Sequence, residues 1–215
     1  MSVKRKPKIS PIGLGLRAVR GGGVAVAVAL DGDEPRVVLS SFMATGSEDD
    51  RISYEPYHVA AEMKRGPGGE VSSEAAAAVA KGRKRQDQLA RKNLSTIVSK
   101  LRSDGHNPAV AALLINRAGW VTDLLAYSLA FADHPPVAEG LAVRDALRFA
   151  IRDAGIEMAE MDEKSLPDLA RQVLHLQSAA LDVRLKALGA SAVKPWRKEQ
   201  KLACLAAWVA LTTLS

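Results

Sequence analysis

The chain has 215 residues and a formal net charge of +6, with 47% hydrophobic, 25% charged and only 4% aromatic residues. This composition is typical of a globular protein that is long enough to bury an aliphatic core. Its apolar runs are shorter than the roughly 20 residues of a membrane-spanning helix, and its single cysteine, Cys204, excludes an internal disulfide. We therefore expect a cytoplasmic protein without a membrane partner.

Residues 1–10 form a basic tail, and residues 11–215 are predicted to form one domain. The tail supplies +4 of the net +6, which leaves +2 for the rest of the chain, and no apolar segment of a secretory signal follows it. Its cations are Lys4, Arg5, Lys6 and Lys8. Such a tail is typical of a solubilising end, and contact with nucleic acid is the alternative.

Three β-strands are predicted at the start of the domain. The segments 12–19 and 24–30 flank a glycine-rich hairpin turn at 20–23, and a third strand at 36–43 follows the turn at 31–33. A loop with a helical turn near 58–64 then leads to a long helix from about 72 to 103. Its apolar residues recur at helical spacing.

The second half of the chain alternates strands and helices. The apolar run at 109–115 is typical of a buried strand, and 156–160 is a shorter one. Helices are predicted at 120–131, 135–154 and 166–188, with a break at 189–191 before a last helix at 195–213. This order predicts an α/β domain of RNase H-like topology. An antiparallel three-strand meander and two parallel strands would form a five-stranded mixed sheet flanked by helices, with 109–115 beside the first strand.

Nucleases of this fold bind two divalent metals through carboxylates on the first strand, the fourth strand and the last helix. Here residues 1–30 contain no Asp or Glu, and the fourth strand ends in Asn116-Arg117. Glu199 is the one acid in the segment 194–201, which opens the last helix. We therefore expect no metal site, no cofactor and no two-metal nuclease activity. The actin-like ATPases of related topology also need an acid in the first strand, which excludes them.

Three residues are candidates for acid–base catalysis. Glu139 lies on the apolar stripe of its predicted helix, so its carboxylate must be paired or have a raised pKa. His58 lies in a loop with two tyrosines, and His134 directly precedes the helix of Glu139. The alternatives are structural: Glu139 would bind backbone groups or an arginine, and the loop would pack on its own aromatic residues.

Ligand-binding candidates are mostly cations, because the predicted cleft carries them where a nuclease would carry acids. The residues expected at its mouth are Arg17, Arg20, Asn116, Arg117, Lys198 and Lys201. Arg144, Arg148 and Arg152 recur at i, i+4 spacing, which is typical of a solvated helix face.

The chain also resembles an uncharacterised bacterial protein family with a strand-rich start, a Pro-Tyr-His segment, a Glu-Gly followed by an arginine, and a Pro-Trp near the end. The matching residues are Pro56-Tyr57-His58, Glu139-Gly140, Arg144, Pro195-Trp196, Lys201 and Ala207-Trp208. The resemblance covers most of the chain after residue 10. It implies the RNase H-like topology and no known activity, and it adds Arg144 and Trp196 to the ligand-binding candidates. Pro135-Pro136 stands where histidines are frequent in the family.

Two functions remain open. The leading hypothesis is a non-nucleolytic binding module for phosphate-containing ligands or nucleic-acid backbone. The alternative is an enzyme that uses His58 and Glu139, with His134 or Lys201, for acid–base chemistry, which convergence of His58 and Glu139 in a pocket would favour. An interaction scaffold built on the long basic helix is a third possibility. Because aromatic residues that could stack on bases are few, we expect little sequence preference.

Overall fold

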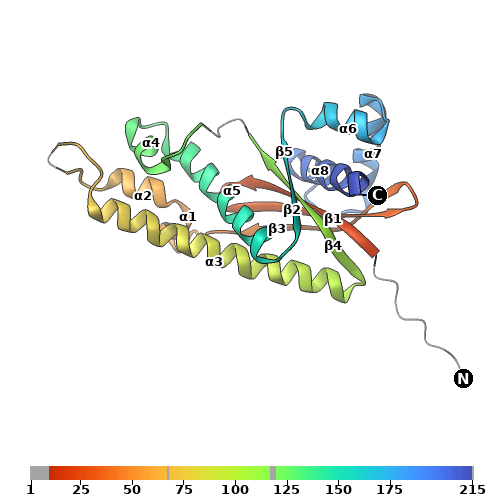
Figure 1. Ribbon diagram of the computed structural model, residues 1–215, viewed down its shortest axis with the longest axis horizontal. Helices are drawn as coiled ribbons and strands as arrows, with labels where there is room; N and C mark the ends of the chain where they lie inside the picture. Colours follow the sequence, from red (N-terminus) through yellow and green to blue (C-terminus); the bar gives the residue numbers. More distant parts are fainter. Residues whose placement is uncertain (1–9, 67, 117–119, 215) are drawn as a thin grey trace, which may run out of the picture.

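The computed structural model describes residues 10–66, 68–116 and 120–214 and contains one five-stranded sheet of order β3-β2-β1-β4-β5 (Figure 1). The strands are β1 (Ser10–Val19), β2 (Gly22–Asp31), β3 (Glu34–Ala44), β4 (His106–Ile115) and β5 (Glu157–Asp162). The first three strands are antiparallel, β4 runs parallel to β1, and β5 runs parallel to β4. The predicted mixed sheet and the pairing of the fourth strand with the first are confirmed.

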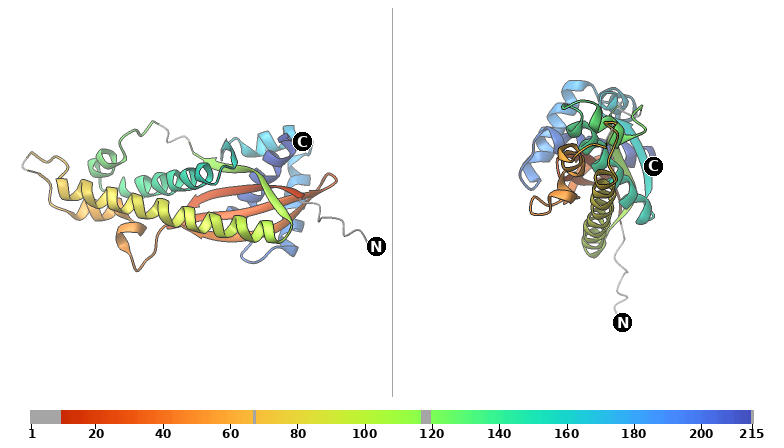
Figure 2. Two further views of the ribbon diagram at one scale, coloured as in Figure 1. Left: turned by 60° about the horizontal axis from the view of Figure 1, so that its bottom comes forward. Right: turned by 90° about the vertical axis from the view of Figure 1, so that its left-hand side faces the viewer.

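Helices cover both faces of this sheet. They are α1 (Arg51–Tyr54), α2 (Pro56–Glu62), α3 (Ser73–Ser103), α4 (Leu124–Ala130), α5 (Pro135–Asp153), α6 (Leu166–Leu174), α7 (Ser178–Ser191) and α8 (Lys198–Leu214). The long α3 and α5 pack on one face, and α8, flanked by α6 and α7, packs on the other (Figure 2). The α3 helix extends beyond the strands, and α1, α2 and α4 gather around that end (Figure 1).

Valine and alanine alternate along β2, so this strand presents large side chains to one face of the sheet and small ones to the other. Val24, Val26 and Val28 belong to the apolar cluster with α8, whereas the alanines between them face the cluster with α3 and α5. Successive side chains of a strand point to opposite faces. The small alanine face leaves room for Leu94 of α3 and Leu147 of α5, which are fully buried.

Two glycines let α8 lie directly against the central strand β1. A Cβ atom on Gly15 would stand 1.8 Å from the carbonyl oxygen of Ala203, and one on Gly13 would stand 2.2 Å from that of Ala207. Both contacts are with helix backbone, which cannot move aside as a flexible side chain can. The position of α8 on the sheet therefore depends on glycine, which has no Cβ atom, at positions 13 and 15.

The burial of α8 agrees with its apolar sequence. Residues 203–211 are all buried, and Cys204 is fully inaccessible. Burial raises the pKa of its thiol to about 12, so Cys204 packs as a small apolar side chain, as expected. Of the helices that the structure describes, none has both the length and the apolar character needed to cross a membrane.

The predicted helix at 166–188 is wrong in its boundaries. It consists of α6 and α7, which are separated at His175, a residue in the left-handed conformation with φ of 52°. The expected break at 189–191 lies inside α7 instead. Gly189 does not interrupt the helix but gives room to the indole of Trp196, because a Cβ there would stand 2.1 Å from Trp196 Cδ1.

We expect Gly15→Ala to destabilise the domain by about 3 kcal/mol, because overpacking against fixed backbone is costly. Gly140→Ala is the matched control, since Gly140 lies inside α5 and a Cβ there meets no atom within 4 Å. That change should stabilise the domain by about 1 kcal/mol through helix propensity. Urea unfolding of the three proteins measures both effects. Equal stability of the Gly15→Ala variant and the unmodified chain would contradict the close packing of β1 and α8.

Candidate functional site

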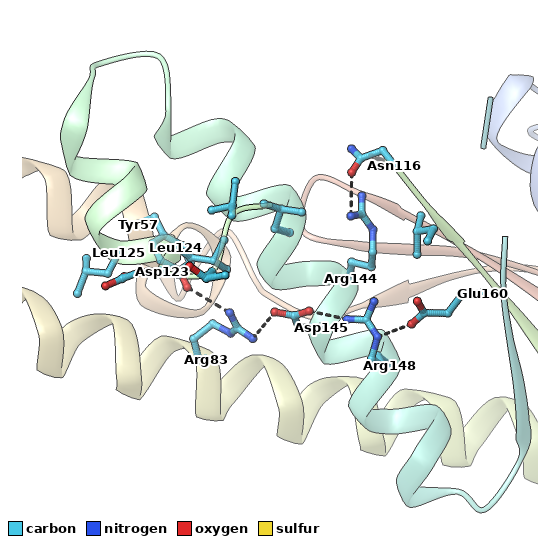
Figure 3. Close-up of a pocket in the computed structure, with 14 residues that line it drawn as sticks. Tyr57, Arg83, Asn116, Asp123, Leu124, Leu125, Arg144, Asp145, Arg148 and Glu160 are labelled. Carbon is cyan, nitrogen blue, oxygen red and sulfur yellow. Dashed lines mark hydrogen bonds and ion pairs between the residues drawn. The ribbon is translucent and has the colours of Figure 1, made fainter. Parts of the chain in front are cut away.

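A cavity of about 650 Å³ lies at the carboxyl end of β4, with α4 and α5 on either side (Figure 3). Tyr57 of α2, Arg83 of α3 and Asn116, which directly follows β4, contribute to its wall. Arg144 from α5 and Glu160 from β5 also line it, as does the segment 121–125 that leads into α4. In open α/β sheets this is the edge at which ligands usually bind.

One wall of the cavity carries a row of alternating charges (Figure 3). Arg83 donates to the hydroxyl of Tyr57 and to a carboxylate oxygen of Asp145, both at 3.1 Å. Arg148 donates to the other oxygen of Asp145 at 2.6 Å and, through Nε, to Glu160. Two arginines are thus matched by two carboxylates, so this row is close to neutral.

Arg144 stands apart from that row. Its Nη1 donates to Oδ1 of Asn116 at 2.9 Å, and no carboxylate in the described part of the chain lies within ion-pair distance of its guanidinium. Its Nε is buried and has no hydrogen-bond partner among the described residues. Burial, and next the nearby charge of Arg148, lower the pKa of Arg144 below the usual arginine value. A half-buried cation without a carboxylate at ion-pair distance is therefore the main electrostatic feature that the described residues give to the cavity.

The carboxyl end of β1 carries a different arginine, and this one is fully paired. Arg17 donates to both carboxylate oxygens of Glu163, at 2.9 and 3.0 Å, and its Nη1 lies 3.9 Å from Oε1 of Glu199 in the first turn of α8. The first strand, which contains no Asp or Glu, therefore places a cation at this edge of the sheet. Glu163 and Glu199 already balance that cation, so a divalent metal ion does not fit this donor set.

A second, mainly apolar pocket of about 290 Å³ brings His58 and Glu139 together. Oε1 of Glu139 accepts from the backbone N–H groups of Tyr57 and His58, at 2.7 and 3.0 Å, and lies 3.4 Å from His58 Nδ1. The carboxylate thus binds the first free N–H groups of α2, where a negative charge is favourable. The expected burial of Glu139 and its bonding to backbone donors are confirmed.

The Glu139 carboxyl has a raised pKa. Burial is the main cause and outweighs the two backbone hydrogen bonds, which act in the opposite direction, so that the pKa reaches about 7. Its Oε2 is buried without a hydrogen-bond partner among the described residues. A carboxyl in this state is about half protonated at neutral pH, and it can accept or donate a proton there.

The remaining ligand-binding candidates do not line one common cleft. Arg20 is exposed and binds Glu55 at 3.1 Å beside the second pocket, and Trp196 packs into the core and donates to the carbonyl of Leu185 at 2.9 Å. Lys198 and Lys201 line a separate cavity of about 340 Å³ with α6 and α7. Arg117 lies outside the described residues. The expectation of a single cation-lined mouth is therefore wrong: the described cations divide among three hollows and the Arg17 ion pair.

His134 does not line either of the first two cavities. It stands directly before α5, where its ring stacks on Tyr127 with centroids 3.9 Å apart and its Nδ1 lies 2.8 Å from the carbonyl oxygen of Tyr127. This arrangement brings it to α4 and not to the carboxyl of Glu139.

Sequence reasoning missed the acids that organise both arginine sites. Asp145 and Glu160 hold Arg83 and Arg148, and Glu163 holds Arg17. The partners Arg17 and Glu163 are 146 positions apart, and no local pattern connects them. The i, i+4 arginines of α5 did carry a signal, but its interpretation as a solvated face is wrong for Arg144 and Arg148, which line the cavity.

Comparisons with known proteins identify the fold. No protein-family model matches the sequence, and no curated protein matches it. The structure is similar to that of Thermus thermophilus RuvC, with a TM-score of 0.51, 10% identity, and coverage of 94% of this chain and 95% of RuvC. It is also similar to T. thermophilus RuvC in complex with a Holliday junction substrate, with a TM-score of 0.54, 10% identity, and coverage of 94% of both chains. These similarities confirm the predicted RNase H-like fold.

Proposed function

We propose that the protein is a binding module that holds the phosphate backbone of a nucleic acid in the cavity around Arg144 and does not cleave it. The observation that carries this proposal is the half-buried guanidinium of Arg144, which has an amide oxygen as partner and no carboxylate at ion-pair distance in the described part of the chain. Partial removal of a cation from water without a paired counter-charge is unfavourable, and a bound anion would supply that charge.

Phosphate suits the donors that remain available. A guanidinium presents several N–H groups in one plane and forms paired, charge-assisted hydrogen bonds with phosphate oxygens. Arg83 and Arg148 are held in place by Asp145, so the wall beside Arg144 is rigid and nearly neutral. An anion would therefore be bound at Arg144 and not spread over all three arginines.

Three further points favour nucleic acid as the source of the phosphate. The cavity lies at the carboxyl ends of the parallel strands β4 and β5, the usual ligand edge of such sheets. One of the two similar RuvC structures holds a nucleic acid, a Holliday junction, on the same fold. The basic tail at residues 1–10 would add non-specific attraction to the same kind of polymer.

Arg144→Ala should weaken binding of a single-stranded oligonucleotide by about tenfold at low salt, because a hydrogen-bonded ion pair is lost. Arg152→Ala is the matched control: it lies two turns further along α5, is exposed, and removes the same charge. That control should change affinity by less than about twofold. Fluorescence anisotropy titrations at two salt concentrations measure both variants.

An equal loss in the two variants would mean that net charge alone is responsible, and the proposed site would then be wrong. A chain that begins at Ile9 provides a second control for the tail. If this truncated chain shows no binding while the full chain binds, the tail accounts for the affinity and the cavity does not.

The full chain should not cut DNA or RNA in Mg²⁺ or Mn²⁺, because Arg17 holds the carboxylates of Glu163 and Glu199 that would otherwise bind metal. Gel assays on single-stranded, duplex and branched substrates check this expectation. Metal-dependent cleavage that persists through purification and disappears in the Glu199→Gln variant would contradict it.

The second candidate function is acid–base catalysis in the smaller pocket. It is favoured by the 3.4 Å approach of His58 Nδ1 to Glu139 Oε1, and by a carboxyl whose pKa is raised to about 7. Such a group is matched to proton transfer at neutral pH. The same carboxylate also caps the N-terminus of α2, and this structural role accounts for its position without any substrate.

A stability measurement tests the state of this carboxyl without a known substrate. Because the folded chain binds the proton more tightly than the unfolded chain, the stability that Glu139 contributes is present below about pH 4.5 and is lost as the pH rises through 7. Glu139→Gln keeps an acceptor for both N–H groups and does not titrate. We expect this variant to gain about 3 kcal/mol relative to the unmodified chain between pH 4.5 and pH 8. Urea unfolding at a series of pH values measures the difference, and a flat difference would remove the basis of the catalytic candidate.

A further inference from the structure

Four rings form a cluster around α4, next to the cavity of Arg144. Trp120 meets Tyr127 edge to face with centroids 5.6 Å apart, Tyr127 stacks on His134 at 3.9 Å, and Phe131 meets His134 edge to face at 5.0 Å. We call these four residues the aromatic platform. The chain has nine Trp, Tyr and Phe residues, counted as three of each, and three of the nine lie here within twelve positions, from 120 to 131.

The outer rings of the platform face solvent. Trp120 and Phe131 are each 69% exposed, the largest exposures among the aromatic residues that the structure describes. Tyr127 packs against the apolar cluster of α2, α3 and α5, and the imidazole of His134 bonds to the Tyr127 carbonyl at 2.8 Å. The inner pair therefore contacts both exposed rings, and such an exposed aromatic patch is typical of a binding surface.

The platform is connected to the wall of the cavity along the chain. Val121, Thr122 and Asp123 follow Trp120 directly and line the cavity, as do Leu124 and Leu125 at the start of α4, the helix that carries Tyr127. A nucleic acid bound at Arg144 that leaves the cavity along this segment would meet the exposed rings. The charged groups near the rings include the exposed acids Asp123 and Asp133 and also Arg65, whose guanidinium donates to the carbonyl of Leu129 in α4.

We propose that the aromatic platform stacks on unpaired nucleobases of a single-stranded nucleic acid whose phosphate is bound at Arg144. This inference rests on the proposed function and gives it a substrate class. Arg144 attracts the charged backbone, and the two exposed rings offer an uncharged surface to the bases beside it. Stacking on aromatic side chains accepts every base, because each base has a π-face.

The proposed stacking predicts tighter binding of single strands than of duplexes. In a duplex the bases are already stacked on each other and paired, so Trp120 and Phe131 can reach them only after the helix opens. A single strand offers its bases without that cost. Little sequence preference is expected because aromatic residues are few, and stacking that accepts every base keeps that expectation.

The test uses the full chain and three probes of equal length: an oligodeoxythymidylate, an abasic oligomer with the same number of phosphates, and a duplex. We expect the thymidylate to bind most tightly and to quench the fluorescence of Trp120, while the abasic oligomer binds more weakly and does not quench. Trp120→Ala and Phe131→Ala should each weaken thymidylate binding by about tenfold and leave abasic binding unchanged. Phe42→Ala is the control, since Phe42 is also an exposed aromatic residue, 55% accessible, but lies on the edge strand β3.

The outcomes distinguish the two proposals. Equal affinity for the thymidylate and the abasic oligomer, or tighter binding of the duplex, overturns the platform and leaves the phosphate site at Arg144 intact. Binding of none of the probes overturns the proposed function and the platform with it. Equal losses in the Phe42→Ala and Trp120→Ala variants also overturn the platform, because any exposed aromatic residue would then have the same effect. Circular dichroism of each variant establishes that the surface substitutions leave the fold unchanged.

Discussion

The close contact between β1 and α8 organises the domain. Because Gly13 and Gly15 have no side chains, the backbone of α8 lies directly on the central strand, and apolar side chains of β2 and β4, the two strands beside β1, pack around the helix. This contact places the first turn of α8 at the carboxyl end of β1, where Glu199 approaches Arg17. The other face of the sheet is then free for α3 and α5, which carry the arginines and acids of the larger cavity. The packing of α8 on one face of the sheet thus determines which charged residues lie close together at its carboxyl edge.

The two arginine sites at this edge differ in how their charge is balanced. Arg17 has two carboxylates nearby, and a bidentate pair of this kind offsets the cost of removing the guanidinium from water. Arg144 has an amide oxygen instead, which accepts a hydrogen bond but does not cancel a charge. The fold therefore contains one arginine whose charge is balanced by carboxylates and one that has no carboxylate at ion-pair distance in the described part of the chain. Tyr57 connects the latter site to the smaller pocket, because its hydroxyl bonds Arg83 while its backbone N–H bonds Glu139.

The fold was largely predictable from the sequence, whereas the site was only partly so. Hydrophobic periodicity and turn residues located all five strands and the long α3, because these signals are local. The boundary between α6 and α7 was missed because His175 adopts a left-handed conformation that is more typical of glycine. Glu139 could be recognised, since a carboxylate on an apolar stripe requires a partner. The pairing of Arg17 with Glu163 could not be recognised, because it depends on which strand ends become neighbours in the sheet.

The wall of the larger cavity contains residues from Tyr57 to Glu160, which lie on two strands, four helices and the segments just after β4 and just before α4. An unfolded chain has no such surface, because these positions are then far apart on average. Any compound that occupies the cavity must therefore bind the native state alone, and mass action converts its binding into resistance to unfolding. At a hundredfold excess over its dissociation constant, such a compound raises the free energy of unfolding by about 2.7 kcal/mol. A rise in the melting temperature of the domain on addition of a compound therefore reports binding, whatever the chemical class of that compound.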